Sequence, residues 1–200
     1  MSFSLTTFGE EETMALGERL SALLCGGAVV LLDGDLGAGK TRFAQGVARG
    51  LGLTGIVTSP TFNLVLEYPV ETGDGSLAGT PAPSLCPNPT VPCPPAKEPS
   101  PVSVLRHFDL YRLEQADQLD DLDYFALIEE PDAVSLVEWG SKFASQLPLD
   151  YILVHLKVDE TDPNKRFLEL SAEGDCSQEL LGRFARSEGM QPTERGGQYD

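Results

Sequence analysis

The sequence has no long hydrophobic run and no apolar leader at its start. A helix that crosses a bilayer needs about 20 consecutive apolar residues, and no stretch of the chain approaches that length. The opening residues MSFSLTTFGEEET soon turn acidic, whereas a signal peptide has a basic region followed by an apolar one. We therefore expect a cytoplasmic protein that does not enter a membrane.

Closely spaced metal-binding residues are also scarce. The four cysteines, Cys25, Cys86, Cys93 and Cys176, form no CxxC pair, and the chain has two histidines. This pattern argues against a zinc site, and nothing in a cytosolic chain of this size supports a disulfide framework. We interpret the cysteines as isolated thiols with no shared chemistry.

Positive charge is what the chain lacks most. Its 14 Lys and Arg stand against 31 Asp and Glu, which gives a net charge of -17. Proteins bind a phosphate backbone with basic residues that displace counterions, so tight direct binding of DNA or RNA is disfavoured. The stretch 114–141 carries nine acids and no Lys or Arg. It indicates either a solvated helix face or a docking surface for a basic protein partner.

What the chain does have is a succession of helix-like and strand-like segments. Apolar residues recur at helical spacing in the segments 10–24, 40–51 and 177–188. Shorter apolar segments predict strands at 28–33, 62–68, 104–113, 133–139, 151–158 and 166–172. The first of these is apolar almost throughout, as expected for a strand covered on both faces. Thr7 and Glu10 fit a capping box just before the first helix.

A proline-rich segment interrupts this pattern. Residues 71–101 hold nine of the 15 prolines and almost no large apolar side chain. Such a segment cannot bury enough surface to offset its ordering entropy, so we expect a disordered insertion between two strands. A proline-rich partner motif is the alternative, although CPPAKEP matches PxxP ligands poorly. The sequence thus predicts one domain over 1–188, interrupted by this insertion, and a flexible tail over 189–200.

The segment GDLGAGKT matches the phosphate-binding P-loop pattern G-x-x-x-x-G-K-[ST]. An apolar strand precedes it and an amphipathic helix follows, which is the setting that a P-loop requires. Glycines let successive N–H groups turn toward an anion, and the helix N-terminus adds positive potential. Lys40 would supply charge to the β- and γ-phosphates of ATP, and the Thr41 hydroxyl would bind Mg²⁺. The candidate ATP-binding residues of this loop are Gly34, Asp35, Leu36, Gly37, Ala38, Gly39, Lys40 and Thr41.

A P-loop usually needs an acidic group that holds the magnesium ion through the waters of the metal. The expected form is a carboxylate at the end of an apolar strand. Glu138 ends the run AVSLVE, and Asp109 lies in HFDLY. We expect Glu138 to hold the metal, with Asp109 as the next candidate. For Asp109 the alternative is a structural ion pair with Arg106 or Arg112.

Four motifs in the same order, GDLGAGKT, SPTFNLVLEY, HFDLYRL and LVEW, resemble the bacterial TsaE (YjeE) family of P-loop ATPases. The resemblance covers about residues 10–70 and 104–172. It implies an α/β, P-loop NTPase-like fold with a mostly parallel central sheet flanked by helices, and ATP and Mg²⁺ as cofactors. It also implies a role in forming threonylcarbamoyladenosine next to the anticodon of tRNAs that read A-starting codons. There the ATPase would support the transferase pair TsaB–TsaD and would meet tRNA only indirectly.

The resemblance also implies roles for single residues. Lys40, Asp109 and Glu138 would be catalytic, with Thr41 and Glu138 on the metal and Asp109 needed for hydrolysis. Trp139 follows the metal carboxylate, as in the family, and a core or rim aromatic is its alternative role.

Three more residues are carried over at the edges of the site. Arg166, which opens RFLEL, matches an arginine that lies near the nucleotide in the family, so we assign it to ATP binding. Ser59 and Thr61 of TSPTF would lie on a mobile loop that faces the γ-phosphate.

The chain departs from the family pattern in two places. The 71–101 insertion exceeds the usual connection, and Gly140 stands where a proline commonly follows the tryptophan. Two other function classes stay open: a P-loop kinase of a small metabolite and a non-catalytic nucleotide-gated adaptor. Such kinases usually carry an arginine-bearing lid, whereas the insertion has one lysine and no arginine.

Overall fold

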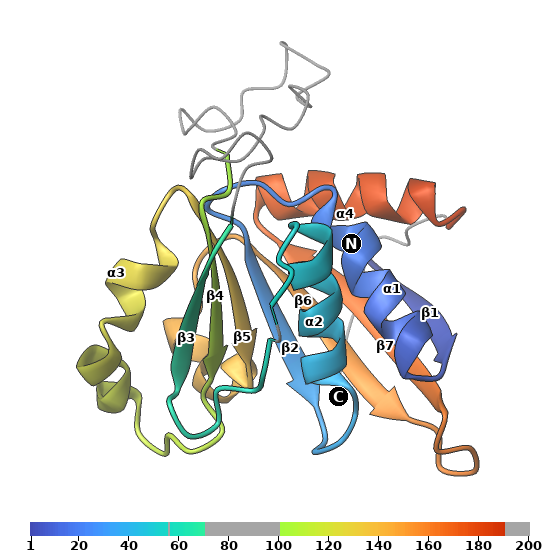
Figure 1. Ribbon diagram of the computed structural model, residues 1–200, viewed down its shortest axis with the longest axis horizontal. Helices are drawn as coiled ribbons and strands as arrows, with labels where there is room; N and C mark the ends of the chain where they lie inside the picture. The colour runs from blue at the N-terminus through green and yellow to red at the C-terminus, as the bar shows by residue number, and fades with distance from the viewer. Residues whose placement is uncertain (56, 71–100, 191–200) are drawn as a thin grey trace.

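A computed structural model describes residues 1–55, 57–70 and 101–190. They form a seven-stranded sheet with helical segments on both faces (Figure 1). One face carries α1 (Glu10–Ser21), α2 (Lys40–Gly50) and α4 (Asp175–Ser187). The other carries α3 (Tyr124–Ile128) and the 3₁₀ segments η1 (Ala116–Leu122) and η2 (Gly140–Gln146). The strands are β1 (Ser2–Phe8), β2 (Val29–Gly34), β3 (Val65–Pro69), β4 (Val104–Asp109), β5 (Ala133–Glu138), β6 (Tyr151–Val158) and β7 (Lys165–Glu173).

The sheet has the strand order β1-β7-β6-β2-β5-β4-β3. Its centre is parallel, because β2 pairs in parallel with β5 and β6, and β5 pairs in parallel with β4. The outer pairs, β3 with β4, β6 with β7 and β1 with β7, are antiparallel. The expected α/β fold is confirmed, with its parallel strands confined to the centre. The loop 159–164 joins β6 to β7 and is too short for the crossover that parallel strands need. These two strands therefore pair in antiparallel.

Burial on both faces accounts for the apolar run in β2. Val30 and Leu32 point into the core under α1 and α2, while Val29 and Leu31 point into the core under η1 and α3. All four side chains are buried. The P-loop therefore starts from a central strand that is covered on both faces, which fixes its position.

The start of the chain differs from the expectation. Residues 2–8 form β1, which pairs with β7 in antiparallel register, so Thr7 lies inside a strand. The predicted capping box is wrong, because Gly9 is the N-cap of α1 and no side chain caps it. Instead, the Glu12 carboxylate accepts a hydrogen bond of 2.7 Å from the Phe8 backbone N–H.

Two strands are shorter than the sequence indicates. The predicted strand 104–113 ends at Asp109, whose carboxylate accepts a hydrogen bond of 3.1 Å from the Tyr111 N–H and so favours a turn. The predicted strand 62–68 begins at Val65. Leu64 has a left-handed backbone, with φ 66, and its N–H reaches the Pro60 carbonyl at 2.6 Å.

Two sequence predictions fall largely outside the described residues, namely those for 71–101 and for 189–200. At the first, Val70 donates to the Ser103 carbonyl at 2.9 Å, so the flanking strand ends are already paired. At the second, Met190 donates to the Ala185 carbonyl at 2.8 Å and packs against the core. Among the described residues, no helix is long and apolar enough to cross a membrane.

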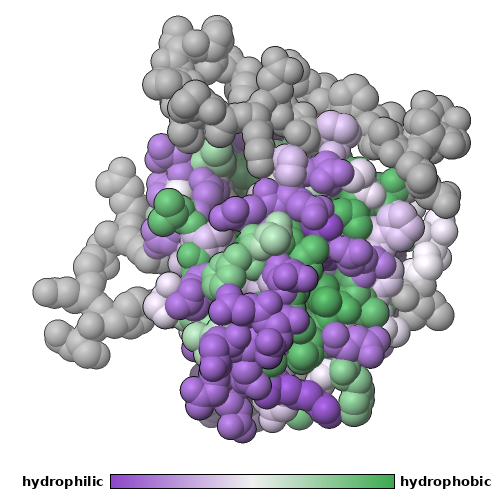
Figure 2. Space-filling model, turned by 90° about the vertical axis from the view of Figure 1, so that its left-hand side faces the viewer, coloured by the Kyte–Doolittle hydropathy of each residue, from purple (hydrophilic) through white to green (hydrophobic). Residues whose placement is uncertain are grey.

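The acidic stretch lies on the face that carries η1 and α3. Figure 2 shows the side of the molecule on which α3 and η1 lie in Figure 1, and hydrophilic residues gather over its lower part. Asp117, Asp120 and Asp121 of η1 are exposed, while Leu119 between them is buried in the core. A solvated face that packs on the core through Leu119 agrees with this pattern, and the docking alternative stays a prediction.

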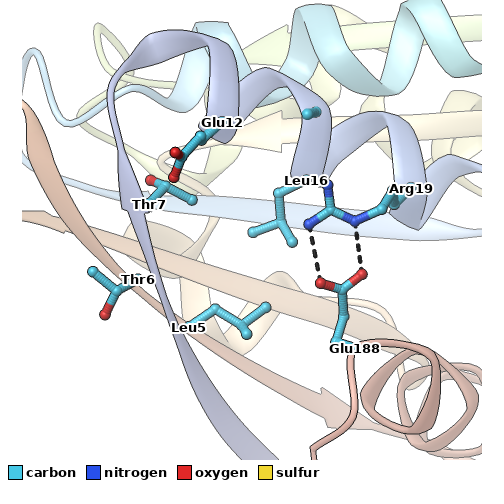
Figure 3. A pocket seen from close by; sticks show the side chains of 8 residues that line it. Leu5, Thr6, Thr7, Glu12, Leu16, Arg19 and Glu188 are labelled. Carbon is cyan, nitrogen blue, oxygen red and sulfur yellow. Dashed lines mark hydrogen bonds and ion pairs between the residues drawn. The ribbon is translucent and has the colours of Figure 1, made fainter.

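A hollow of about 260 Å³ lies between β1, α1 and the end of α4 (Figure 3). Leu5 and Leu16 form its apolar wall, and Arg19 and Glu188 form a two-fold hydrogen-bonded ion pair across it at 2.7 and 3.0 Å. Arg19 is half exposed, so the pair contributes on the order of 1 kcal/mol or less. No P-loop residue lines this hollow, which lies where α1 packs near the end of α4 and is separate from the P-loop.

Candidate nucleotide-binding site

The P-loop connects β2 to α2 and depends on glycine at three positions. Gly34, Gly37 and Gly39 have φ values of 129, 80 and 109, a region that side chains with a Cβ rarely enter. A Cβ on Gly34 would lie 2.0 Å from the Leu156 carbonyl oxygen, and one on Gly37 would meet nothing within 4 Å. Gly39 is the N-cap of α2, so the helix N-terminus opens toward the loop. The positive φ values and the helix N-terminus thus give the loop the backbone shape that an anion cradle requires.

Lys40 extends across this cradle. Its Nζ donates to the carbonyl oxygens of Gly34 and Asp35 at 2.7 and 2.9 Å. It also lies 4.1 Å from the centre of the Trp139 ring, a cation–π distance. Burial lowers the pKa of the Lys40 ammonium from its ordinary value, and the charges of Glu138 and Asp109 oppose that shift. The ammonium is therefore held beside the loop that would take the phosphates.

Glu138 ends β5 as expected and is almost fully buried. Its Oε1 accepts a hydrogen bond from the Thr41 hydroxyl at 3.1 Å. The same oxygen lies 3.0 Å from Nε2 of His107, a residue of β4 that sequence reasoning did not select. One signal was available in the sequence: His107 stands two residues before Asp109, so both lie on the same face of β4.

Asp109 lies opposite Glu138 in the parallel register of β4 and β5. Its Oδ2 accepts hydrogen bonds from the hydroxyls of Ser59, at 3.0 Å, and Thr61, and these two hydroxyls lie 2.7 Å apart. The two residues of the TSPTF loop thus meet the second candidate carboxylate. Arg106 does not form the ion pair with Asp109 that was the alternative. Its guanidinium binds Glu67 and Glu130 instead.

Trp139 turns the chain directly after Glu138. It has a left-handed backbone, with φ 64, and its N–H donates to the Leu32 carbonyl at 3.1 Å. Its ring lies 5.2 Å from that of Tyr111, and Lys142 donates to the Tyr111 carbonyl at 2.7 Å. The sequence did not indicate that Tyr111 and Lys142 lie beside Trp139. Their position depends on the packing of the turn after β4 against η2, which are distant in the sequence.

Arg166 reaches the P-loop from β7, on the other side of the loop from Glu138. A Cβ on Gly39 would lie 3.3 Å from its Nε, so the guanidinium borders the N-terminus of α2. One terminal nitrogen donates to the Asn164 carbonyl at 2.9 Å. The Nε is buried and has no hydrogen-bond partner among the described residues. A buried cation with an unused donor beside a helix N-terminus is suited to an anion.

The donor set at this site is compatible with magnesium bound together with a nucleotide. The described part of the chain contains no group of three or more His, Cys, Asp or Glu that could hold a metal by itself. Mg²⁺ commonly keeps several waters and is held by one or two protein groups plus substrate phosphates. The Thr41 hydroxyl and the Glu138 carboxylate, 3.1 Å apart, form such a pair at the end of the P-loop.

The site therefore gathers almost every residue that the sequence indicated. Lys40, Thr41, Glu138 and Trp139 are joined by direct contacts, and Asp109 neighbours Glu138 across the two strands. Leu36 is exposed in the loop, whereas Ala38 is buried.

Comparisons with known proteins agree with these features. The family described as "Threonylcarbamoyl adenosine biosynthesis protein TsaE" matches residues 7–78 and 96–167. A Bacillus subtilis protein named tRNA threonylcarbamoyladenosine biosynthesis protein TsaE is 33% identical over 187 residues, which cover 92% of this chain and 94% of the relative. A Mycobacterium tuberculosis (strain H37Rv) protein of that name is 36% identical over 157 residues, covering 76% of this chain and 77% of the relative. A crystal structure of Bacillus subtilis YdiB superposes with a TM-score of 0.64 at 30% identity, covering 94% of this chain and 97% of that one.

Proposed function

Because the chain belongs to the TsaE family, we propose that it is a magnesium-dependent ATPase that serves the formation of threonylcarbamoyladenosine in tRNA. The modified nucleoside would be the one next to the anticodon of tRNAs that read A-starting codons. The names of the family and of the relatives support the tRNA role. The observation that carries the ATPase role is the hydrogen bond between Thr41 and Glu138 at the end of the P-loop, beside the loop-bound ammonium of Lys40.

Nucleotide binding would begin with an exchange of partners at Lys40. The ammonium now donates to two carbonyls of its own loop. A triphosphate in the cradle offers stronger, charged acceptors, so Lys40 would turn to the β- and γ-phosphate oxygens. The backbone N–H groups of the loop would hold the same phosphates, and Arg166 would use its free Nε on the other side.

Thr41 and Glu138 would hold the metal. When bound, Mg²⁺ would neutralise charge on the phosphate oxygens. The Thr41 oxygen has a lone pair for the metal while its proton still donates to Glu138. Glu138 would act through the metal's waters, as a buried acceptor.

Hydrolysis needs a group that orients water in line with the γ-phosphorus. We assign this role to Asp109, which neighbours Glu138 and faces the TSPTF loop. Attack by the water oxygen breaks the bond from the γ-phosphorus to the bridging oxygen and gives ADP and phosphate. Ser59 and Thr61 now occupy Oδ2 of Asp109, so they would have to release that oxygen before water could use it.

The ATPase would act on tRNA through protein partners. The transferase subunits TsaD and TsaB are the partners that the family resemblance implies. The net charge of -17 supports an indirect role, because few cations are available to bind a phosphate backbone. The cytoplasm, where tRNAs are modified, is the compartment that this role implies.

One observation supports a second candidate, a nucleotide-gated adaptor that hydrolyses little ATP by itself. Oδ1 of Asp109 accepts the Tyr111 N–H and Oδ2 accepts two hydroxyls, so three of the four lone-pair sites of the carboxylate are already used. In that case nucleotide occupancy alone would control partner binding.

The deciding experiment measures ATP turnover by the chain alone and with the transferase pair, using the wild type and Thr41→Ala. The ATPase proposal expects magnesium-dependent turnover that Thr41→Ala abolishes in both conditions. Turnover below detection in both conditions, together with ATP-dependent partner binding, would favour the adaptor. Retained turnover in Thr41→Ala would contradict the proposed site.

A further inference from the structure

His107 is a buried polar residue beside the nucleotide site. It lies on β4, its side chain is completely buried, and its Nε2 lies 3.0 Å from Oε1 of Glu138. Its other ring nitrogen, Nδ1, has no hydrogen-bond partner among the described residues. The ring therefore makes one directed contact, and that contact is to the candidate metal carboxylate.

Packing alone gives a poor reason for a histidine at this position. By strand alternation His107 shares its face with Leu105, which lies in the apolar core under α1 and α2. Burying a ring nitrogen without a partner destabilises the fold, and an apolar side chain of similar volume would avoid that cost. Burial thus accounts for the size of the side chain and leaves its polarity unexplained.

The direction of the contact identifies what the ring does. An ionised carboxylate oxygen only accepts, so Nε2 is the nitrogen that donates the proton. The hydroxyl of Thr41 donates to the same oxygen, Oε1, at 3.1 Å. Two donors on one oxygen fix the rotation of the Glu138 carboxylate and leave its other oxygen, Oε2, for the water shell of the metal.

We propose that His107 is a positioning residue for the magnesium–nucleotide site: its Nε2–H holds the Glu138 carboxylate in the orientation that receives the metal's waters. This inference rests on the proposed binding of magnesium and ATP. Partners of metal-binding groups typically change metal affinity by about 10–100-fold when they are removed. His107 acts one step further from the metal, through Glu138, so we expect an effect near the lower end of that range.

The test compares two amide variants of different reach. In His107→Gln the side-chain nitrogen lies at about the distance of the original Nε2 and can donate to Glu138. In His107→Asn the same group is one bond shorter and falls short of it. Ser135→Ala is the matched control, because Ser135 is also a buried polar residue without a partner among the described residues. It lies on β5 and by alternation faces away from Glu138.

The readout is equilibrium binding of labelled ATP, measured without metal and at increasing Mg²⁺, so no turnover is needed. In His107→Asn, about ten-fold more Mg²⁺ should be required for half of the maximal effect of Mg²⁺ on ATP binding. Binding of ATP without metal should be unchanged. The Mg²⁺ requirements of His107→Gln and Ser135→Ala should stay within two-fold of the wild-type value.

Equal Mg²⁺ requirements in the Gln and Asn variants would overturn the proposal. Loss of metal-free ATP binding in both would do the same, because it would assign His107 to folding. If the wild type itself shows no Mg²⁺ effect on ATP binding, the proposed function fails, and that outcome is distinct from the first two.

Discussion

The substitution Glu138→Gln removes a charge from the site and keeps the shape of the side chain. The amide oxygen can still accept from the Thr41 hydroxyl and from His107, which now reach Oε1 at 3.1 and 3.0 Å. The amide nitrogen replaces Oε2 and cannot accept a hydrogen bond from a metal-bound water. The variant therefore loses the interaction with the metal and retains the packing of β5.

The size of the effect follows from the kind of bond that is lost. A hydrogen bond to a charged group contributes about 1.5–3 kcal/mol. Since each 1.4 kcal/mol is ten-fold, the Mg²⁺ requirement should rise by roughly 10–150-fold. Binding of ATP without metal should change little, because the P-loop N–H groups and Lys40 do not depend on Glu138 for their contacts with phosphate.

The assay titrates Mg²⁺ against ATP turnover and against ATP binding in the wild type and in Glu138→Gln. We expect a large loss of turnover at low Mg²⁺ and a melting temperature close to that of the wild type. Normal turnover at low Mg²⁺ would refute the reasoning, and Asp109 would then be the next candidate for the metal carboxylate.

Three further predictions concern the phosphate cradle, the insertion and the acidic face. Lys40→Ala should reduce ATP turnover by about 10²–10³-fold, the cost of removing one charged donor, while Lys157→Ala at an exposed position should not change it. Deletion of 73–98 should leave turnover intact and be neutral or slightly stabilising, at about 0.6 kcal/mol per halving of the loop. The Val70–Ser103 hydrogen bond already joins the strand ends, and a melting temperature many degrees lower would contradict this. Three acids of η1 are exposed, namely Asp117, Asp120 and Asp121. Changing all three to lysine should weaken transferase binding without changing basal turnover. Unchanged affinity would exclude a docking role for them.

The centre of the fold was predictable because its signals are local. The apolar run of β2 is buried on both faces, the glycines of the P-loop have positive φ, and α2 follows directly. The same logic placed Glu138 at a buried strand end, where the structure has it. Each of these features depends on residues that are neighbours in the sequence.

The features that sequence reasoning missed depend on contacts between distant segments. β1 carries only a weak strand pattern, and it is stabilised by pairing with β7 at the other end of the chain. The contact of His107 with Glu138 depends on which strands are neighbours and in which register, since β4 and β5 are separated by η1 and α3. A sequence indicates which face His107 occupies, but not what it meets there.

The central claim is that ATP turnover by this chain drives the modification of tRNA through the transferase pair. The direct measurement is the yield of threonylcarbamoyladenosine over many cycles in a reconstituted reaction that contains tRNA, the transferase pair, ATP and either the wild type or Lys40→Ala. The account predicts sustained modification with the wild type and little or none with Lys40→Ala. Equal yields with the two proteins, or with neither added, would contradict it.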